Sequence, residues 1–303
     1  MSKLCELADG VHLLPGSTNL GVVDLAGGRA LAIDSGLDES AARKLLRALQ
    51  ESGRRLTVIL STHSHADHIG GNAFLVQRTG CRVAAPAVEA SLLRAPAWEP
   101  LYLFGGAYPP APARSKFLMA AAGPVDLVLE PGPVEFEGRS LELVPLPGHS
   151  PGQLGVLVGN VLFAADAYFD PPVLEKHGLP YFAAVQESLA TLDRLESLTA
   201  GLVIPSHGRP VDDPRPSLDA NRRALRQGLN HALELLAGAG EGIPTETVVA
   251  SLLHRLGIRC RDLGHYLLCR AAVLAYLTHL VDTGVAAVGV GDDNVPRWEV
   301  CGR

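Results

Sequence analysis

Three histidines and an aspartate lie within six consecutive positions in the first quarter of the chain. They belong to the segment His63-Ser64-His65-Ala66-Asp67-His68. Neutral imidazoles and carboxylates are ligands that suit zinc, and also iron or manganese. Packed together without a cation, four such side chains would be crowded polar groups at a high cost in free energy. The spacing therefore favours a metal site over a surface loop that is merely rich in histidine.

Three further side chains of ligand type each follow an apolar segment. His149 lies in the loop 146–152, where glycines and prolines restrict the backbone around a single histidine. Asp166 follows the apolar segment 160–164, and His207 follows the apolar segment 201–204. A carboxylate at the end of an apolar strand is poorly solvated there and well placed to bind a cation. These three positions extend the candidate site beyond the first cluster.

The elements that must position these side chains are strands with helices between them. Apolar and alternating segments predict strands at 10–14, 19–25, 30–34, 56–60, 81–85, 125–130, 134–136, 141–144, 153–158, 160–164 and 201–204. Helical periodicity predicts helices at 38–50, 86–93 and 183–198, and another that begins at Asn72. Each candidate ligand therefore follows a strand, where α/β proteins gather their chemistry. If the strands share one sandwich, the loops can converge on one rim.

Two segments have the composition of pocket walls. Residues 95–123 combine aromatic residues with five prolines, and a second loop follows Asp166. Such long insertions often form lids or pocket walls, although they also cover exposed apolar surfaces or form subunit contacts. The residues we expect in the substrate pocket are Tyr102, Phe104, Tyr108, Tyr168, His177 and Tyr181.

Composition narrows the class of protein. The formal net charge of -6 gives no overall attraction to nucleic acid or to anionic membranes. The five cysteines are scattered without zinc-knuckle or redox spacing, which indicates free thiols in a reducing compartment. The first residues lack the apolar core of a signal peptide, and the apolar segment 271–281 is too short to span a bilayer. We therefore expect a cytoplasmic protein that does not associate with membranes.

The histidine and aspartate pattern resembles the metallo-β-lactamase superfamily. The resemblance covers roughly the first 210 residues, and it implies an α/β fold, the αββα sandwich, in which two mixed sheets face each other with helices outside. It also implies a binuclear site of two divalent ions, zinc first, with iron or manganese as alternatives. Under this resemblance His63, His65 and His149 hold one ion, Asp67, His68 and His207 hold the second, and Asp166 bridges both.

The resemblance also implies a mechanism. Two nearby cations lower the pKa of a shared water, so that a metal-bound hydroxide is the nucleophile at neutral pH. Asp67 would orient this nucleophile or accept its proton. Asp34 resembles the carboxylate that steadies the ligand loop in the family. An equally good interpretation of Asp34 is a turn-forming residue at the end of a strand.

Substrate preference is predicted from the resemblance of two motifs to those of known enzymes. Gly70-Gly71 and the loop 147–153 resemble glyoxalase II and other thioesterase-like members, which favours an ester or a thioester of a small molecule. Two alternatives stay open, because fold and metal alone permit several chemistries. One is a phosphodiesterase or ribonuclease. The other is non-hydrolytic: a mononuclear iron enzyme similar to a persulfide dioxygenase, or a binding module.

The last third of the chain is predicted to be mainly helical. After a proline-rich linker at 209–216, helices are expected at 218–236, from 243–245 to 257, and from 262–264 to about 283, with a hairpin of 285–288 and 297–300. This order resembles a winged helix, and we expect domains at 1–212 and 217–303. From Arg215 onward there are ten arginines, no lysine and nine acidic residues. So weak a positive charge favours packing over the site or a homodimer contact over nucleic-acid binding.

Overall fold

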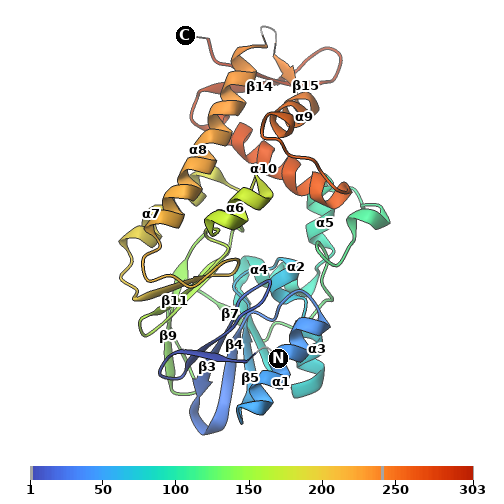
Figure 1. Ribbon diagram of the computed structural model, residues 1–303. Coiled ribbons are helices and arrows are strands. Elements are labelled where there is room, and N and C mark those ends of the chain that lie inside the picture. Colours follow the sequence, from blue (N-terminus) through green and yellow to red (C-terminus); the bar gives the residue numbers. More distant parts are fainter. Residues whose placement is uncertain (1–2, 240–241, 303) are drawn as a thin grey trace.

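The computed structural model describes residues 3–239 and 242–302. Two sheets face each other with helices on their outer sides, and a mainly helical region lies beyond one end of this sandwich (Figure 1). This is the two-sheet arrangement with flanking helices that the sequence predicts. Among the described residues no helix combines the length and the apolar character needed to cross a bilayer.

The first sheet contains seven strands in the order of the chain. They are β1 (Cys5–Ala8), β2 (Val11–Leu14), β3 (Leu20–Leu25), β4 (Arg29–Ile33), β5 (Arg55–Leu60), β6 (Arg82–Pro86) and β7 (Leu127–Leu129). Pairing is antiparallel from β1 to β4 and parallel from β4 to β7. The change follows from the connections, because hairpins join antiparallel strands and helical crossovers join parallel ones. These crossovers supply α1 (Glu39–Glu51), α3 (Asn72–Thr79) and α4 (Ala87–Arg94) on the outer face.

The second sheet contains five strands. Its order is β12-β11-β10-β9-β8, with a parallel pair only between β11 and β12. The strands are β8 (Gly132–Phe136), β9 (Arg139–Pro145), β10 (Leu154–Val158), β11 (Val161–Ala165) and β12 (Leu202–Pro205). The crossover from β11 to β12 contains α6 (Pro171–His177) and α7 (Val185–Ser197). Leu192 and Leu195 of α7 are buried in the cluster that covers the outer face of this sheet.

A dry core joins the inner faces of the two sheets. It contains Leu31, Val58 and Leu60 from the first sheet, and Val156 and Phe163 from the second. The sheets approach closely where Gly21 of β3 faces Phe163. A Cβ atom at position 21 would lie 2.8 Å from the Phe163 ring, so only glycine leaves room for it. Because the sheets are locked face to face, the loops at one edge of both sheets are held next to each other.

The helical region contains three helices and a small sheet. Its elements are α8 (Arg215–Ala237), β13 (Ile243–Pro244), α9 (Thr245–Arg255), α10 (Leu263–Asp282), β14 (Ala286–Val290) and β15 (Pro296–Val300). One buried cluster runs without interruption from Val144 in β9 to Leu280 in α10. The helical region therefore packs on α6 and α7, beyond the end of the sandwich. The expected helices and hairpin are present, while the division into domains at 1–212 and 217–303 and the winged-helix comparison stay predictions.

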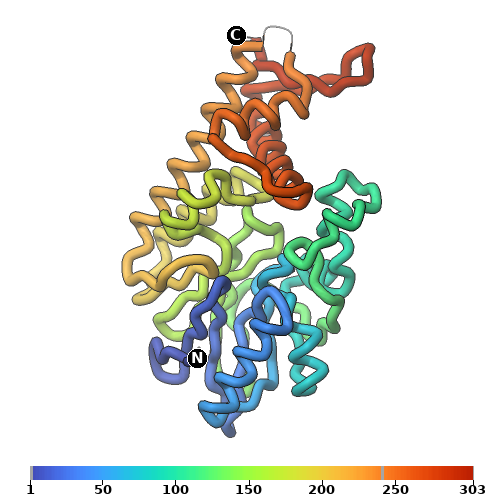
Figure 2. Tube along the Cα trace, turned by 45° about the vertical axis from the view of Figure 1, so that its right-hand side comes forward, coloured from blue at the N-terminus to red at the C-terminus, as the bar shows by residue number. Residues whose placement is uncertain are grey.

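The 95–123 insertion is more ordered than its composition indicates. It contains α5 (Trp98–Leu103) and a 3-10 turn (Ala111–Ala113). Leu103 and Leu118 of the insertion pack with Leu267 of α10. Figure 2 shows the insertion beside the N-terminal end of α10, so segments far apart in the sequence meet near the loop edge of the sandwich.

Three other local predictions need correction. The helix α8 begins at Arg215 rather than Leu218, within the expected linker, because proline is compatible with the first turn of a helix. The segment expected to be a loop after Asp166 contains α6, which begins at Pro171 for the same reason. The strand β1 was not predicted from the sequence, because its residues are largely exposed.

The packing of α8 on α10 depends on Gly228. A Cβ atom there would lie 2.2 Å from the ring and the hydroxyl of Tyr276, which is 1% exposed. Helix propensity alone predicts that Gly228→Ala stabilises the protein by about 0.5–1 kcal/mol. We expect the opposite, a loss of about 1–3 kcal/mol from overpacking, measured by urea denaturation. Gly238→Ala at the end of α8, where the nearest atom is 3.5 Å away, is the control and is expected to be neutral. Equal stability of the two variants would contradict this packing.

Candidate metal centre

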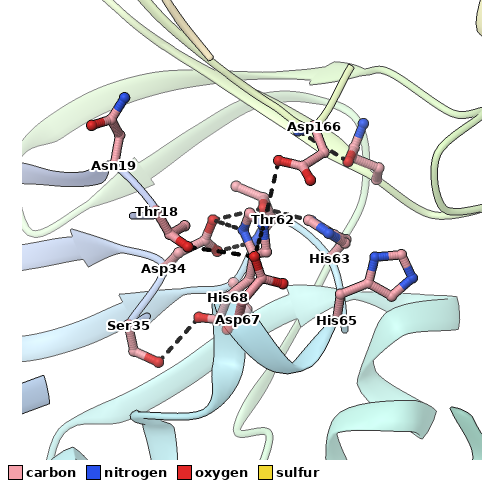
Figure 3. Close-up of polar contacts among 12 residues, drawn as sticks. Thr18, Asn19, Asp34, Ser35, Thr62, His63, His65, Asp67, His68 and Asp166 are labelled. Carbon is pink, nitrogen blue, oxygen red and sulfur yellow. Dashed lines mark hydrogen bonds and ion pairs between the residues drawn. The ribbon is translucent and has the colours of Figure 1, made fainter. Parts of the chain in front are cut away.

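The seven predicted ligand side chains lie at one edge of the sandwich. His63 and His65 follow β5, Asp67 and His68 lie in the short helix α2 (Ala66–Ile69), and His149 lies between β9 and β10. Asp166 follows β11, and His207 follows β12. Figure 3 shows Asp166 reaching from the second sheet toward the loop that carries His63 and His68. Residues more than 140 positions apart in the chain thus meet where the strands of both sheets end.

Their ligand atoms are within a few ångströms of one another. His65 Nδ1 lies 2.8 Å from His149 Nε2, and His207 Nε2 lies 3.1 Å from Asp67 Oδ2. Asp166 lies between the two groups. Its Oδ2 is 3.4 Å from both His149 Nε2 and His207 Nε2. Its Oδ1 is 3.4 Å from His68 Nε2.

The cluster contains polar atoms that the protein does not satisfy. Within the described chain, His63 Nε2, His68 Nε2 and Asp166 Oδ1 are buried without a hydrogen-bond partner. Buried polar atoms in native proteins normally have a partner, so three orphans in one place require an explanation. Cations bound in the cluster would satisfy these atoms, because each histidine Nε2 has a lone pair once its ring is neutral and Asp166 Oδ1 is a carboxylate oxygen.

Hydrogen bonds behind the histidines determine which nitrogen faces the centre. His68 Nδ1 lies 2.8 Å from Asp34 Oδ2, His149 Nδ1 lies 2.9 Å from the Tyr181 carbonyl, and His207 Nδ1 lies 2.7 Å from the Ser17 carbonyl. Donation from Nδ1 leaves Nε2 of each ring free as a ligand.

Asp34 combines the two interpretations that the sequence left open. It adopts the left-handed conformation with φ 62, which suits a turn at the end of β4. Its carboxylate also accepts hydrogen bonds from the Thr62 backbone N–H and hydroxyl, at 2.8 and 2.9 Å, in addition to its contact with His68. A strained backbone whose side chain makes three polar contacts is typical of a functional position.

The electrostatics divide the cluster into two halves. Burial, followed by the neighbouring histidines, lowers the pKa of His63 well below its usual range. Burial lowers the pKa of His65 to about 3 and also lowers that of His149. These three imidazoles are neutral at physiological pH. They provide the state that metal coordination requires.

The other half holds negative charge. Burial opposes ionisation of Asp67 and Asp166, but nearby His68 and His207 lower the pKa of both carboxyls. In turn, although burial lowers it, Asp166 and Asp67 raise the pKa of His207 to about 10. The ionised carboxylates therefore favour the binding of positive charge at this edge of the sandwich. A divalent cation would supply it.

The residues fit a binuclear metal site. Three groups of side chains could each hold an ion, because the ligand atoms within each group lie within 4.8 Å of one another. They are His63, His65 and His149; His63, His68 and Asp166; and Asp67, His68 and His207. The first and third groups match the two ion sets that the family resemblance implies, and Asp166 lies between them. Which ion is bound, and the role of each side chain as a ligand, stay predictions.

The predicted pocket residues are distributed unevenly. The ring of Tyr181 lies 5.3 Å from that of His65 and 5.4 Å from that of His149. Tyr102, Phe104 and Tyr108 are exposed on the insertion, and His177 is exposed at the end of α6.

Tyr168 lies in a different environment from the other predicted pocket residues. It is 1% exposed and belongs to the core under the second sheet, not to the surface of the site. A small cavity nearby is lined instead by Phe169, Tyr181 and Asp166, and it extends to Leu192 and Leu225. The ring of Phe169 stacks on His207 at 6.3 Å. Phe169 is thus an apolar neighbour of the metal centre that the sequence did not indicate.

Two buried glutamates near the site also escaped sequence analysis. Glu89 of α4 is completely buried and accepts hydrogen bonds from the two ligand loops. Glu99 of α5 is 6% exposed, and burial together with the charges of Asp67 and Glu89 raises its pKa well above its usual range. Neither has a spacing motif. Glu89 lay in a predicted helix and Glu99 in the 95–123 insertion, and neither position offered a signal that could have identified it.

Comparisons with known proteins agree with this geometry. Residues 13–207 match the model of the metallo-β-lactamase superfamily. A hydroxyacylglutathione hydrolase of Rhodopseudomonas palustris (strain BisB18) is 56% identical over 50 residues, which are 16% of this chain and 20% of that protein. Another from Albidiferax ferrireducens is 29% identical over 174 residues, 56% of this chain and 53% of that protein. The chain thus spans about half or less of the length of these curated relatives.

Solved structures share the fold over nearly the whole chain. A metallo-β-lactamase family protein from Thermus thermophilus has a TM-score of 0.76 and 24% identity, and the match covers 98% of this chain and 100% of that one. A β-lactamase domain protein from Burkholderia ambifaria has a TM-score of 0.73 and 23% identity, covering 98% and 93%. These likenesses show the fold, and the helical region is included in it. With the family model matching most of the sandwich, this chain belongs to the metallo-β-lactamase superfamily.

Proposed function

We propose that this protein is a zinc-dependent hydrolase with two metal ions, acting on thioesters of small molecules. The observation that carries the proposal is the convergence of five histidines and two aspartates, with three orphaned buried atoms, at one edge of the sandwich. A cluster of this kind has no plausible structural role, because the same positions filled with apolar residues would fold at lower cost.

The chain's own residues divide the work of hydrolysis. When bound, two divalent cations would lower the pKa of a shared water and polarise the carbonyl of the substrate. His63, His65 and His149 would hold the first ion and Asp67, His68 and His207 the second, with Asp166 between them. Asp67, whose carboxyl stays ionised, would orient the attacking water and accept its proton. The ring of Phe169 beside His207 would exclude bulk water from one side.

Thioester chemistry is supported by the relatives rather than by the metal centre. The proteins with 53–56% identity over the matched segments of about 50 residues are hydroxyacylglutathione hydrolases. Their name describes hydrolysis of a glutathione thioester. In this chain, Gly70-Gly71 and the loop around His149 resemble the motifs of such thioester hydrolases. Transfer of this activity to the present chain is our proposal.

The substrate pocket is proposed to lie between the metal centre and the insertion. Tyr181 would supply its wall next to His65 and His149. Glu99, from the same insertion, would contribute a carboxyl that is kept neutral by burial. A neutral wall of this kind suits an uncharged acyl group better than a phosphate.

The replacement Asp166→Asn tests the two-ion assignment. It retains the shape of the side chain but removes the charge between the two groups. We expect turnover to fall by about 100-fold or more and metal content to fall below two ions per chain. We expect the variant to remain folded, because the hydrophobic core of the sandwich lies elsewhere. Thioester kinetics and elemental analysis provide the readouts. Asp213→Asn, which removes an exposed ion pair with Arg215, is the control. Normal turnover of Asp166→Asn would refute the two-ion assignment.

A substrate panel tests the chemistry. The protein is loaded with zinc, iron or manganese and supplied with a hydroxyacylglutathione thioester, a lactone and bis(p-nitrophenyl) phosphate. We expect the zinc form to hydrolyse the thioester about 100-fold more efficiently than the phosphodiester. Preference for the phosphodiester would favour a phosphodiesterase or ribonuclease, to which the wing-like hairpin would belong. One iron per chain with oxygen uptake on a persulfide would favour the dioxygenase.

Glu99→Gln tests whether the pocket carboxyl is neutral. The raised pKa in the folded protein means that wild type loses stability as pH rises above about 4.5, the usual value for glutamate, while the glutamine variant does not. In metal-stripped protein we expect the difference in melting temperature, variant minus wild type, to increase between pH 4 and pH 8. Thermal denaturation across this range measures it. A difference that stays constant with pH would show that Glu99 ionises normally in the folded protein.

A further inference from the structure

A single buried carboxylate connects the two loops that carry the first group of histidines. Glu89 is 0% exposed and lies in the first turn of α4, directly after β6. Its Oε2 accepts a hydrogen bond of 3.0 Å from the backbone N–H of Ser64. Its Oε1 accepts hydrogen bonds from the hydroxyl of Ser150 at 2.5 Å and from the backbone N–H of Gly152 at 2.8 Å.

The positions of these donors matter because two of them adjoin candidate ligands and the third, Gly152, lies in the same loop as His149. Ser64 lies between His63 and His65, and Ser150 directly follows His149. Glu89 thus connects a loop of the first sheet with a loop of the second. The two loops meet where His65 Nδ1 approaches His149 Nε2 to 2.8 Å.

The chain surrounds this carboxylate in a way that only a carboxylate satisfies. Its two oxygens accept hydrogen bonds from three donors. A glutamine in its place would put an NH2 group, itself a donor, against one of these N–H or O–H donors. In the described residues these three donors, and no lysine or arginine, are the hydrogen-bond partners of the Glu89 side chain. A Cβ atom at Gly152 would lie 3.0 Å from Oε1, so the glycine leaves room for the carboxylate.

The second group of ligands is supported by different residues. Asp34 orients His68, and the Ser17 carbonyl orients His207. Thr18 lies 3.4 Å from Asp67, and Asn19 donates hydrogen bonds to the carbonyls of Pro205 and Gly208, which flank His207. Figure 3 shows Thr18, Asn19 and Asp34 on the side of the centre away from His65. Glu89 contacts none of these supports in the hydrogen bonds of the described chain.

We propose that Glu89 is a positioning residue that sets His63 and His65 against His149 and thereby determines the affinity of the first metal position. This inference rests on the proposed two-ion function. Loss of the carboxylate would let the two loops separate and would weaken the first ion without affecting the second. Partners behind metal ligands typically contribute about 10- to 100-fold in metal affinity.

The test measures metal affinity in two single-ion backgrounds. His207→Ala is designed to disrupt the second position and His149→Ala the first. Cobalt(II) absorption titrations of metal-stripped protein then report the remaining position, without any substrate. In the His207→Ala background we expect Glu89→Gln to weaken cobalt binding by about 10- to 100-fold. In the His149→Ala background we expect no change. An equal effect in both backgrounds, or no effect in either, would overturn the proposal.

Two further variants keep the test decisive if Glu89→Gln folds poorly. Ser150→Ala removes one of the three hydrogen bonds and leaves the carboxylate in place, so a smaller loss at the first position is expected. Glu246→Gln removes a hydrogen-bonded ion pair between α9 and α10, away from both loops, and should change neither affinity. An unchanged first-position affinity in folded Ser150→Ala would then overturn the proposal. Failure of the unmodified protein to bind two ions or hydrolyse a thioester would instead refute the proposed function.

Discussion

The central interaction of the structure is the attraction of a positive charge by buried carboxylates at the edge shared by two sheets. Asp67 and Asp166 are ionised carboxylates inside a largely buried cluster, and they hold the pKa of His207 at about 10. His63, His65 and His149, by contrast, stay neutral because burial excludes the protonated form. Such an arrangement is costly unless a cation offsets it. The fold therefore serves as a scaffold that keeps these ligand atoms close together, although their burial costs free energy.

That scaffold acts through rigid strand ends and a few long-range hydrogen bonds. The sheets lock together where Gly21 meets Phe163, which brings the ends of β5, β9, β11 and β12 to one edge. Separate supports then orient the two halves of the cluster. Asp34, strained at φ 62, controls one histidine of the second half, whereas Glu89 connects the loops of the first.

Much of the centre could be predicted from the sequence because its signals are local. The ligands from His63 to His68 can be recognised by their spacing. His149, Asp166 and His207 can be recognised because each follows an apolar segment that forms a strand. Side-chain direction and distant contacts could not be predicted in this way. Tyr168 and Tyr181 come from one stretch, yet one is buried in the core and the other faces His65. Glu89 contacts residues 25 and 61 positions away, and nothing near it in the sequence indicates this.

The central claim is that these seven side chains surround two cations. Anomalous X-ray scattering from crystals grown with zinc, with data on both sides of the zinc absorption edge, tests it most directly. The account predicts two peaks a few ångströms apart. One should lie among His63, His65 and His149, the other among Asp67, His68 and His207, with Asp166 between them. A single peak, or peaks bound elsewhere on the chain, would contradict it.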